Sequence, residues 1–368
     1  MAGLKSGVDM KTLLPIVLIV LFGFFALGIP LSVLPAHVRQ VLALGDVWVG
    51  VVLGLQSVVT LMTRHYAGTI ADTQGAKTAV LRGVVVILVS GLITLSSLSA
   101  QNYTALSVIL LGRITLGAGE SLLITGALAW GVGLFGPAKA GRVMAWSGMA
   151  MYAAIAASAP LANFVAQYFG FAGVFVSAIL LPVIAGAISL FVPAVPANGA
   201  GRLPFYAVIH RVWKPGLGLA LSAVSFVGLA GFVVLLFKER SWQNASFVMT
   251  LFGAAYIAAR LLFANAPDQY GGKKVAMVSL IVAALGQALL WRGEEPLWAF
   301  AGAVLTGFGY SLTFPAFGVE AVKSVEPQHK GVALGAYVAF FDLSLAVTAP
   351  LQVGSPVTSA MQRYICLA

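Results

Sequence analysis

Three charged side chains fall inside long apolar stretches of the sequence, and the two acids among them could take up and release protons. Arg113 and Glu120 lie in the stretch 104–134, and Asp342 lies in the stretch 331–351. An apolar environment raises the pKa of a carboxyl group, whereas a nearby arginine lowers it. That competition would let an acid bind a proton in one conformation and release it in another. We expect Glu120 and Asp342 to titrate or to bind substrate; the alternative is that both are structural acids bonded to Tyr, Ser or Arg.

The spacing of Arg113 and Glu120 places both on one face of a helix. Seven positions at about 100° per residue bring Glu120 nearly back over Arg113, about 10 Å further along the axis. That distance excludes a direct ion pair within the helix but allows both to line one cavity. Four polar residues in other apolar stretches could form hydrogen bonds to a substrate or, alternatively, only between helices. They are Gln56, Tyr152, Asn163 and Tyr310.

A polar signature occurs twice, 196 positions apart, and each copy follows an apolar run. The first copy comprises Arg64, Gly68, Asp72, Gly75 and Lys77. The second comprises Arg260, Ala264, Asp268, Gly271 and Lys273. Only 9% of the residues are charged, so chance is a poor explanation of this repetition. The pattern predicts two homologous halves, each with a charged turn after its second helix.

Glycine and proline positions repeat with a second offset, of 190 positions. The first copy has Gly117, Gly119 and Pro160, and the second has Gly307, Gly309 and Pro350. We expect these glycines to serve close packing between helices. Together the two offsets predict a six-helix unit duplicated in parallel, an arrangement that carries a site near the membrane midplane in transporters.

The composition indicates lipid as the solvent, since hydrophobic residues make up 60% of the 368 and the mean hydropathy is +0.99. Lipid offers no partners for open backbone groups, so the spans must be helices of roughly 20 residues. The expected fold class is therefore an all-α integral membrane protein with eleven helices. The expected spans are 12–35, 48–70, 78–99, 104–134, 141–167, 170–193, 215–237, 245–266, 274–292, 296–321 and 331–351.

These spans predict an N-terminal six-helix half over residues 1–195, a cytoplasmic linker over 196–214 and a five-helix half over 215–351. Duplication calls for a twelfth helix, but the tail 352–368 is too short and too polar to span. We interpret this end as truncated or frame-shifted; the alternative is a genuine eleven-helix variant with an external tail.

The distribution of basic residues predicts orientation. With a cytoplasmic N-terminus, 15 of the 21 Lys and Arg residues fall in inside segments and 4 in outside loops. This asymmetry follows the positive-inside rule and predicts a multi-pass protein of the inner membrane with its N-terminus in the cytoplasm. Basic residues scattered through short loops argue against nucleic acid as a partner.

The sequence lacks the residues that several classes of chemistry require. The single cysteine, Cys366, excludes an intramolecular disulfide framework and a multi-thiolate metal site. No Gly-rich phosphate loop and no His-Glu-x-x-His helix occurs. We therefore expect no metal, no cofactor and no enzyme, since an intramembrane enzyme would need a converging catalytic set that the sequence does not offer.

The first signature resembles the loop motif between helices 2 and 3 of the major facilitator superfamily, and Arg113-x3-Gly117-x-Gly119 resembles its helix 4 motif. The resemblance covers the chain except its last 17 residues. The stretch 119–150 is most similar to the bacterial branch of sugar-efflux (arabinose-efflux-permease-like) transporters. Thr73 and Ala76 stand where the loop motif usually has basic residues, and Ala159 stands where the helix 5 motif of proton-coupled exporters has glycine.

The resemblance implies that Asp72 meets the positive N-terminal end of helix 11, with Gly68 allowing the close approach. Asp72 would then be a gate latch; the alternative is a plain loop cap or topology determinant. It also implies a monomeric secondary transporter that works by alternating access, with protons and a small solute as partners. Export of a sugar or drug-like solute by proton antiport is the expected mode. The alternatives are an uptake symporter and a truncated, transport-incompetent membrane protein.

Overall fold

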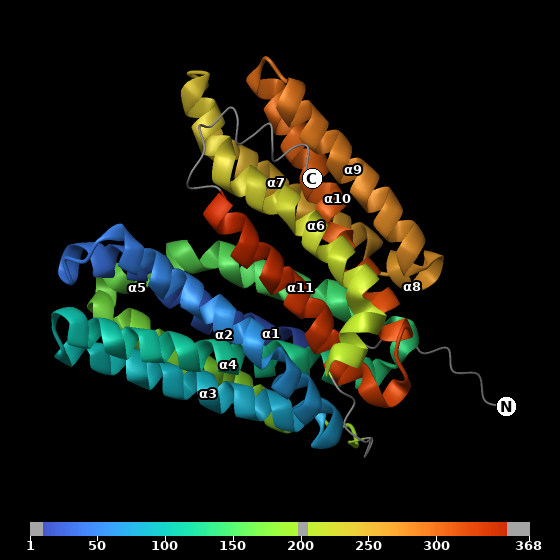
Figure 1. The fold of residues 1–368 in the computed structure, drawn as a ribbon, viewed down its shortest axis with the longest axis horizontal. Coiled ribbons are helices and arrows are strands. Elements are labelled where there is room, and N and C mark those ends of the chain that lie inside the picture. Colours follow the sequence, from blue (N-terminus) through green and yellow to red (C-terminus); the bar gives the residue numbers. More distant parts are fainter. Residues whose placement is uncertain (1–9, 198–204, 352–368) are drawn as a thin grey trace. The chain divides into compact units, whose positions relative to one another are not determined.

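The protein is an all-α integral membrane protein. The computed structural model describes residues 10–197 and 205–351, and within these ranges it contains no β-strand. Seven helical segments of the described chain are long and apolar enough to cross a membrane, judged by length and composition. The helices, labelled in Figure 1, are α1 (Met10–Ala36), α2 (Asp46–Thr73), α3 (Ala76–Ser96), α4 (Asn102–Phe135), α5 (Ala140–Phe191), α6 (Phe205–Glu239), α7 (Ala245–Phe263), α8 (Ala266–Tyr270), α9 (Gly272–Arg292), α10 (Pro296–Lys323) and α11 (Lys330–Leu351).

Helix α5 covers two of the expected spans, and a glycine divides it. Gly170 has φ 67° and ψ −176°, which is not a helical conformation. Only glycine adopts such a backbone at little cost because it has no Cβ. The division lies at the boundary expected between the fifth and sixth spans.

Helix α6 begins at Phe205, ten residues before the expected start at position 215. The segment before Pro215 carries Val208 and Val212, both fully buried, at the four-residue spacing of one helix face. The polar composition of this segment predicted a linker up to residue 214, but the segment is helical from Phe205 because one of its faces is buried. The rest of that linker includes residues 198–204, which lie outside the described residues, as does the tail 352–368 with the question of a twelfth helix.

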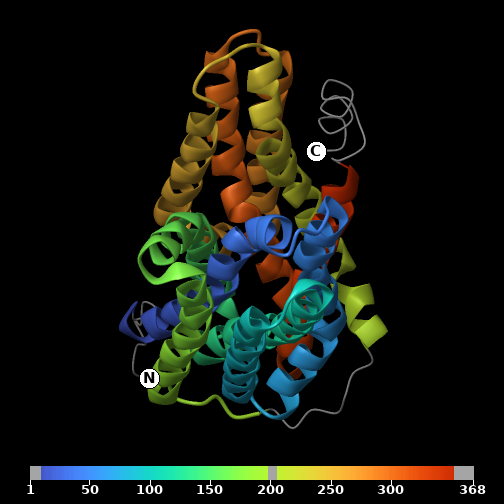
Figure 2. The ribbon, with the colours of Figure 1, turned by 90° about the vertical axis from the view of Figure 1, so that its left-hand side faces the viewer.

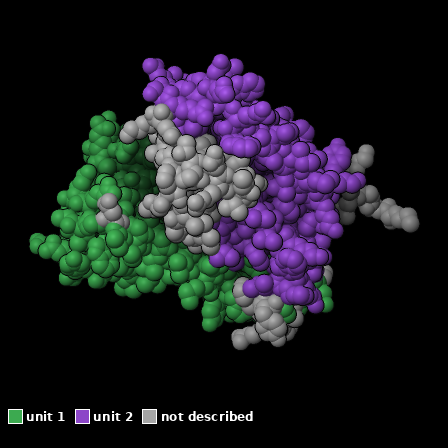
Figure 3. Space-filling model, turned by 45° about the horizontal axis from the view of Figure 1, so that its top comes forward, with its two compact units in different colours: residues 1–136, 147–208, 326–336 green, residues 137–146, 209–325, 337–368 purple. Residues whose placement is uncertain are grey.

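The chain divides into two compact units, coloured separately in Figure 3. Unit 1 comprises residues 1–136, 147–208 and 326–336, and unit 2 comprises 137–146, 209–325 and 337–368. Each unit thus includes a short segment from the other half of the chain. The start of α5 belongs to unit 2, and the start of α11 belongs to unit 1.

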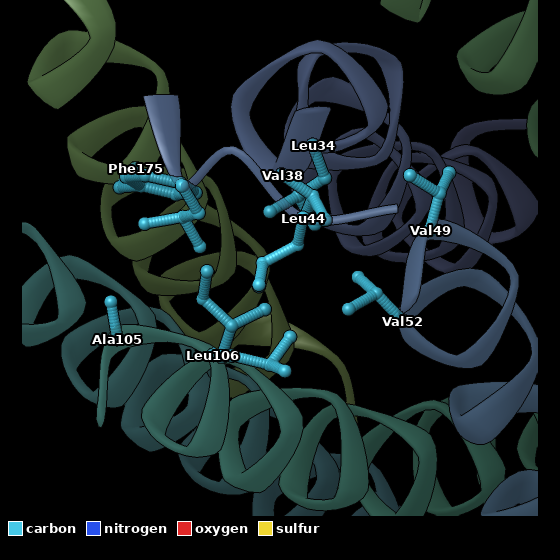
Figure 4. Packing of buried hydrophobic residues seen from close by; sticks show 10 residues of the cluster. Leu34, Val38, Leu44, Val49, Val52, Ala105, Leu106 and Phe175 are labelled. Atoms are coloured by element: carbon cyan, nitrogen blue, oxygen red, sulfur yellow. The ribbon is translucent and has the colours of Figure 1, made fainter. Parts of the chain in front are cut away.

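In unit 1, α4 is the central helix and packs against both α2 and α3. Figure 1 shows these three helices side by side. A cluster of buried apolar side chains lies at one end of this group. Figure 4 shows side chains that converge from α1, α2, α4 and the second part of α5, among them Leu34, Val52, Leu106 and Phe175.

Unit 2 repeats this arrangement with its own helices. Helix α10 packs against α9 and α7, as α4 packs against α3 and α2. Figure 2 shows α7, α9 and α10 as neighbouring rods in yellow and orange. The same helix order in both units is what duplication of the sequence signatures predicts.

Candidate functional site

Each copy of the repeated signature forms a tight turn whose glycine has a left-handed backbone. Gly75 has φ 99° and joins α2 to α3. Gly271 has φ 89° and joins α8 to α9. A side chain at either position would strain the turn, because L-residues rarely adopt positive φ. This conformation explains why glycine stands at the same place in both copies.

Asp72, in the last turn of α2, binds the start of α11 within unit 1. Its Oδ1 accepts a hydrogen bond from the Gly331 N–H at 2.7 Å, and its Oδ2 accepts one from the Val332 N–H at 2.8 Å. The first N–H groups of a helix have no partner inside the helix and carry partial positive charge. A carboxylate that accepts two of them both caps the helix and complements its dipole.

Asp268 makes the same contact in unit 2, with the start of α5. Its Oδ1 accepts from the Gly141 N–H at 2.8 Å, and its Oδ2 accepts from the Arg142 N–H at 2.9 Å. Burial raises the pKa of Asp268 above its ordinary value, although the two backbone hydrogen bonds oppose that rise. Asp268 therefore takes up a proton at milder acidity than an exposed aspartate.

Glycines let these helix starts come close to the carboxylates. A Cβ on Gly331 would lie 2.5 Å from Asp72 Oδ1, and one on Gly141 would lie 2.8 Å from Asp268 Oδ1. In unit 1 the approach is tight on both sides, because a Cβ on Gly68 would lie 2.5 Å from the Val332 Cα.

The two arginines of the signature lie within helices rather than in loops, and both are buried. Arg64 Nη1 donates to Thr125 Oγ1 on α4 at 3.4 Å. Arg260 Nε donates to the Ser311 carbonyl at 2.9 Å, and its Nη1 donates to the Ala145 carbonyl at 2.7 Å. The same guanidinium lies 4.7 Å from the centre of the Tyr256 ring, within cation–π range. Arg260 thus joins α7 to α10 and to the start of α5 inside unit 2.

The lysines of the two copies differ. Lys77 Nζ donates to the carbonyls of Leu190 at 3.2 Å and Val192 at 2.8 Å, at the end of α5. A lysine at a helix C-terminus satisfies open carbonyls and complements the negative end of the dipole. Lys273, its counterpart, is exposed.

Glu120 lies on α4, and α2 holds its carboxylate within unit 1. Its Oε2 accepts a hydrogen bond from Gln56 Nε2 at 2.7 Å and another from Thr60 Oγ1 at 3.1 Å. Thr60 Oγ1 also donates to the Gly117 carbonyl at 3.1 Å in an alternative bond. Glu120 and Gln56, two of the residues singled out in the sequence, thus come together, and Thr60 joins them.

Arg113 lies two turns before Glu120 on the same helix and is buried. Its Nε donates to the Val52 carbonyl of α2 at 3.0 Å, and its Nη1 has no partner among the described residues. A buried guanidinium nitrogen without a partner is costly, so this atom is available for a ligand or a water molecule. The two charged residues face the same neighbouring helix but contact different parts of it.

The remaining candidates are divided between the two units. In unit 2, Tyr310 is buried and stacks on Phe226 with ring centres 5.6 Å apart, and Asp342 is buried on α11. In unit 1, Tyr152 is half-buried and Asn163 is exposed, both on α5. Of the candidates in unit 1, Glu120 and Gln56 are joined by a hydrogen bond.

The repeated Gly-x-Gly pairs contact two different helices each. A Cβ on Gly117 would lie 2.5 Å from the Gln56 carbonyl oxygen, and one on Gly119 would lie 2.7 Å from a side-chain carbon of Ile87 on α3. A Cβ on Gly307 would lie 2.3 Å from the α7 backbone, and one on Gly309 would lie 2.5 Å from the α9 backbone. These glycines hold the central helix of each unit against both neighbours. Pro160 and Pro350 lie within α5 and α11.

Four-residue glycine spacing does not always mark close packing in this chain. Gly50 and Gly54 on α2 have this spacing, yet a Cβ on either would have no atom of the described residues within 4 Å. Gly331 and Gly335, with the same spacing, do meet α2 closely.

Sequence reasoning missed four residues that the structure places in these contacts. Thr60, Gly141 and Gly331 were not assigned to a site, and neither was Tyr337, whose buried hydroxyl donates to the Phe314 carbonyl at 2.7 Å. The signal for the two glycines was their common offset of 190 positions. In the part of the chain that the structure describes, no three His, Cys, Asp or Glu side chains gather as they would around a metal ion.

Comparison with known proteins identifies the family. A family model described as Major Facilitator Superfamily matches residues 16–241 and 216–354. The chain belongs to the major facilitator superfamily. An uncharacterized MFS-type transporter of Salmonella typhimurium is 42% identical over 330 residues, which cover 89% of this chain and 85% of the relative. A second uncharacterized MFS-type transporter, from Pseudomonas aeruginosa, is 43% identical over 92% of this chain and 85% of its own.

Solved superfamily structures have the same fold. The crystal structure of the human organic anion transporter MFSD10 (TETRAN) superposes with a TM-score of 0.80 at 16% identity, covering 98% of both chains. The proton:xylose symporter XylE, bound to 6-bromo-6-deoxy-D-glucose, superposes with a TM-score of 0.76 at 13% identity over 98% of this chain and 94% of its own. As a superfamily member the chain is a multi-pass membrane transporter and not an enzyme.

Proposed function

We propose that this superfamily member exports a small polar or amphipathic solute, a sugar or a drug-like compound, in exchange for protons. The observation that carries the proposal is the Glu120 carboxylate, which neutral donors on α2 hold at 2.7 and 3.1 Å within apolar helices. Gln56 and Thr60 can donate to the carboxyl whether or not it carries a proton. The charge of Arg113, on the same helix, interacts with the ionised form. A buried ionisable residue in such surroundings is a candidate for a proton relay.

Asp342 is the second proposed titrating acid, and Arg113 the proposed cavity arginine. The helix caps at Asp72 and Asp268 supply the proposed gate: each carboxylate binds the start of one helix, and opening would break two charge-assisted hydrogen bonds. Similarity of the stretch 119–150 to sugar-efflux transporters favours export. In this proposal the protein acts as a monomer in the inner membrane, with its N-terminus in the cytoplasm.

Uptake by proton symport is the second candidate. The proton:xylose symporter has the same fold as this chain, so fold alone does not decide the direction of transport. The two modes differ in one measurable respect: an exporter accumulates solute in inverted vesicles with an acidic interior, whereas a symporter releases it.

The test is transport in inverted membrane vesicles under an imposed pH gradient, with sugars and cationic dyes as solutes. Glu120→Gln keeps an acceptor oxygen for Gln56 and Thr60 but cannot titrate. It should abolish accumulation driven by the gradient while leaving solute exchange at equal pH intact. Glu294→Gln, at an exposed turn, is the matched control and should behave as the parent chain.

Gradient-driven accumulation by Glu120→Gln at the parent rate would refute the coupling role. If the parent chain moves none of these solutes, the export proposal is refuted for sugars and cationic dyes.

A further inference from the structure

Unit 2 contains a groove that the proposed transport cycle does not use. Its volume is about 300 Å³, and its walls come from the end of α7, from α8, from α9 and from α10. The residues that line it are Phe263, Ala266, Tyr270, Lys274, Val275, Val278, Ser279, Val282, Phe308, Gly309 and Leu312. Apart from one lysine, one tyrosine hydroxyl and one serine, these side chains are apolar.

The groove lies where the second helix of this half is broken. In unit 1, α2 runs without interruption to Thr73. In unit 2 the corresponding segment ends as α7 at Phe263 and restarts as α8, with Pro267 in its first turn. Proline has no N–H for a helical hydrogen bond, so the ladder is interrupted there. The broken segment borders the groove on one side, and α9 and α10 border it on the other.

The face around the groove is apolar and exposed. Val278 and Ile281 on α9 and Leu262 on α7 expose 59%, 55% and 72% of their surfaces. Exposed aliphatic side chains on membrane helices are in contact with lipid chains rather than with water. A groove within such an apolar face would be open to the hydrocarbon of the bilayer.

One end of the groove is positively charged. Lys274 lines it in the first turn of α9, and Lys273 beside it is also exposed. Among the described residues Lys274 forms no salt bridge, and Glu320 of α10 pairs with Lys323 at 3.3 Å. The phenol of Tyr270, which is 68% exposed, lies at the same end of the groove. An apolar groove with a cation at one end matches an amphiphile that carries a negative head and a hydrocarbon chain.

We propose that this groove binds an anionic phospholipid. One acyl chain lies along Val275, Val278 and Val282, opposite Phe308 of α10, and the phosphate contacts the Lys274 ammonium. Basic groups at the ends of membrane helices bind anionic head groups in this way. The site is independent of the direction of transport and includes neither of the proposed titrating acids, Glu120 and Asp342.

The test is photocrosslinking of the purified full-length chain in nanodiscs. One set of discs contains phosphatidylglycerol that carries a diazirine on one acyl chain, and a second set contains phosphatidylcholine with the same chains. Mass spectrometry locates the adducts. Adducts should concentrate on peptides of α8, α9 and α10 that line the groove, and phosphatidylglycerol should give about fivefold more of them than phosphatidylcholine.

Two pairs of variants separate the head-group contact from the chain contact. Lys274→Ala should reduce the phosphatidylglycerol adducts about fivefold, whereas Arg292→Ala, at the opposite exposed end of α9, should not. Val278→Trp fills the groove and should remove adducts from both lipids. Leu285→Trp, equally exposed on α9 but outside the groove, should retain them.

Three results would overturn the site: adducts spread evenly over the lipid-facing helices, equal yields from the two lipids, or phosphatidylglycerol yields that Lys274→Ala leaves unchanged. Circular dichroism of each variant checks that its helices are intact.

Discussion

Replacing Asp72 by asparagine should weaken the attachment of α11 to α2. The two carboxylate oxygens accept the N–H groups of Gly331 and Val332 at 2.7 and 2.8 Å. Asparagine keeps one acceptor oxygen and turns an NH₂ group toward the other N–H, which leaves one buried backbone donor without an acceptor. An unsatisfied buried donor costs about 1–3 kcal/mol. We expect the free energy of unfolding to fall by about 2 kcal/mol.

Gly331→Ala tests the same contact from the other side. Its Cβ would lie 2.5 Å from Asp72 Oδ1, so it must displace the carboxylate from both N–H groups. Since each substitution disrupts the same two hydrogen bonds, their effects should not add. The double variant should be only slightly less stable than the weaker single variant, with a coupling energy of about 1–2 kcal/mol.

The assay is reversible unfolding of the purified chain in mixed micelles of a mild detergent and a denaturing detergent, followed by the fluorescence of its 7 tryptophans. Losses that add to within about 0.5 kcal/mol would refute a shared contact. A fully stable Asp72→Asn variant would show that the two N–H groups find other acceptors.

Three further predictions concern packing and the buried arginine. Gly117→Ala should destabilise the protein by about 1–3 kcal/mol, because the added Cβ overpacks the contact with α2. Gly54→Ala, at a position with open space around it, should be neutral or stabilising. Thermal unfolding in detergent distinguishes the two variants, and equal midpoints would contradict the packing role of Gly117. Tyr337→Phe should cost about 1 kcal/mol for one lost hydrogen bond, with the exposed Tyr103 changed to Phe as the control that should leave the midpoint unmoved. Arg113→Ala should lower vesicle transport about tenfold or more at equal membrane abundance, since it removes a buried cation and leaves its former partners without it. Transport by this variant at the rate of the parent chain would exclude a role for Arg113 in the cavity.

The repeated signatures account for most of what could be predicted about the fold from the sequence. The glycines of both turns, Gly75 and Gly271, follow directly from their place between two apolar runs, because a tight reversal needs a left-handed residue. The helix order within each unit follows from the duplication. The spacing of Gly117 and Gly119 likewise predicted close packing, although not that each glycine meets a different helix.

Other features depend on tertiary contacts that leave no mark in the local sequence. The early start of α6 is set by burial of Val208 and Val212, which outweighs the proline that follows them. The role of Thr60 in holding Glu120 could not be found, because a threonine in an apolar run has the same appearance whether its hydroxyl bonds its own helix or a neighbour. The partner of Asp72 was implied by resemblance alone, since a backbone N–H group has no sequence signature.

The two helix caps join at very different moments during synthesis. Asp268 binds the Gly141 N–H, which lies 127 residues earlier, so its partner has already been synthesised when Asp268 is added to the chain. Asp72 must wait for Gly331, which lies 259 residues later. At about 5–20 residues per second that delay is on the order of 10–50 s. The first unit therefore remains incomplete in the membrane until α11 has been synthesised, and any chain that stops before α11 leaves Asp72 without the helix it caps.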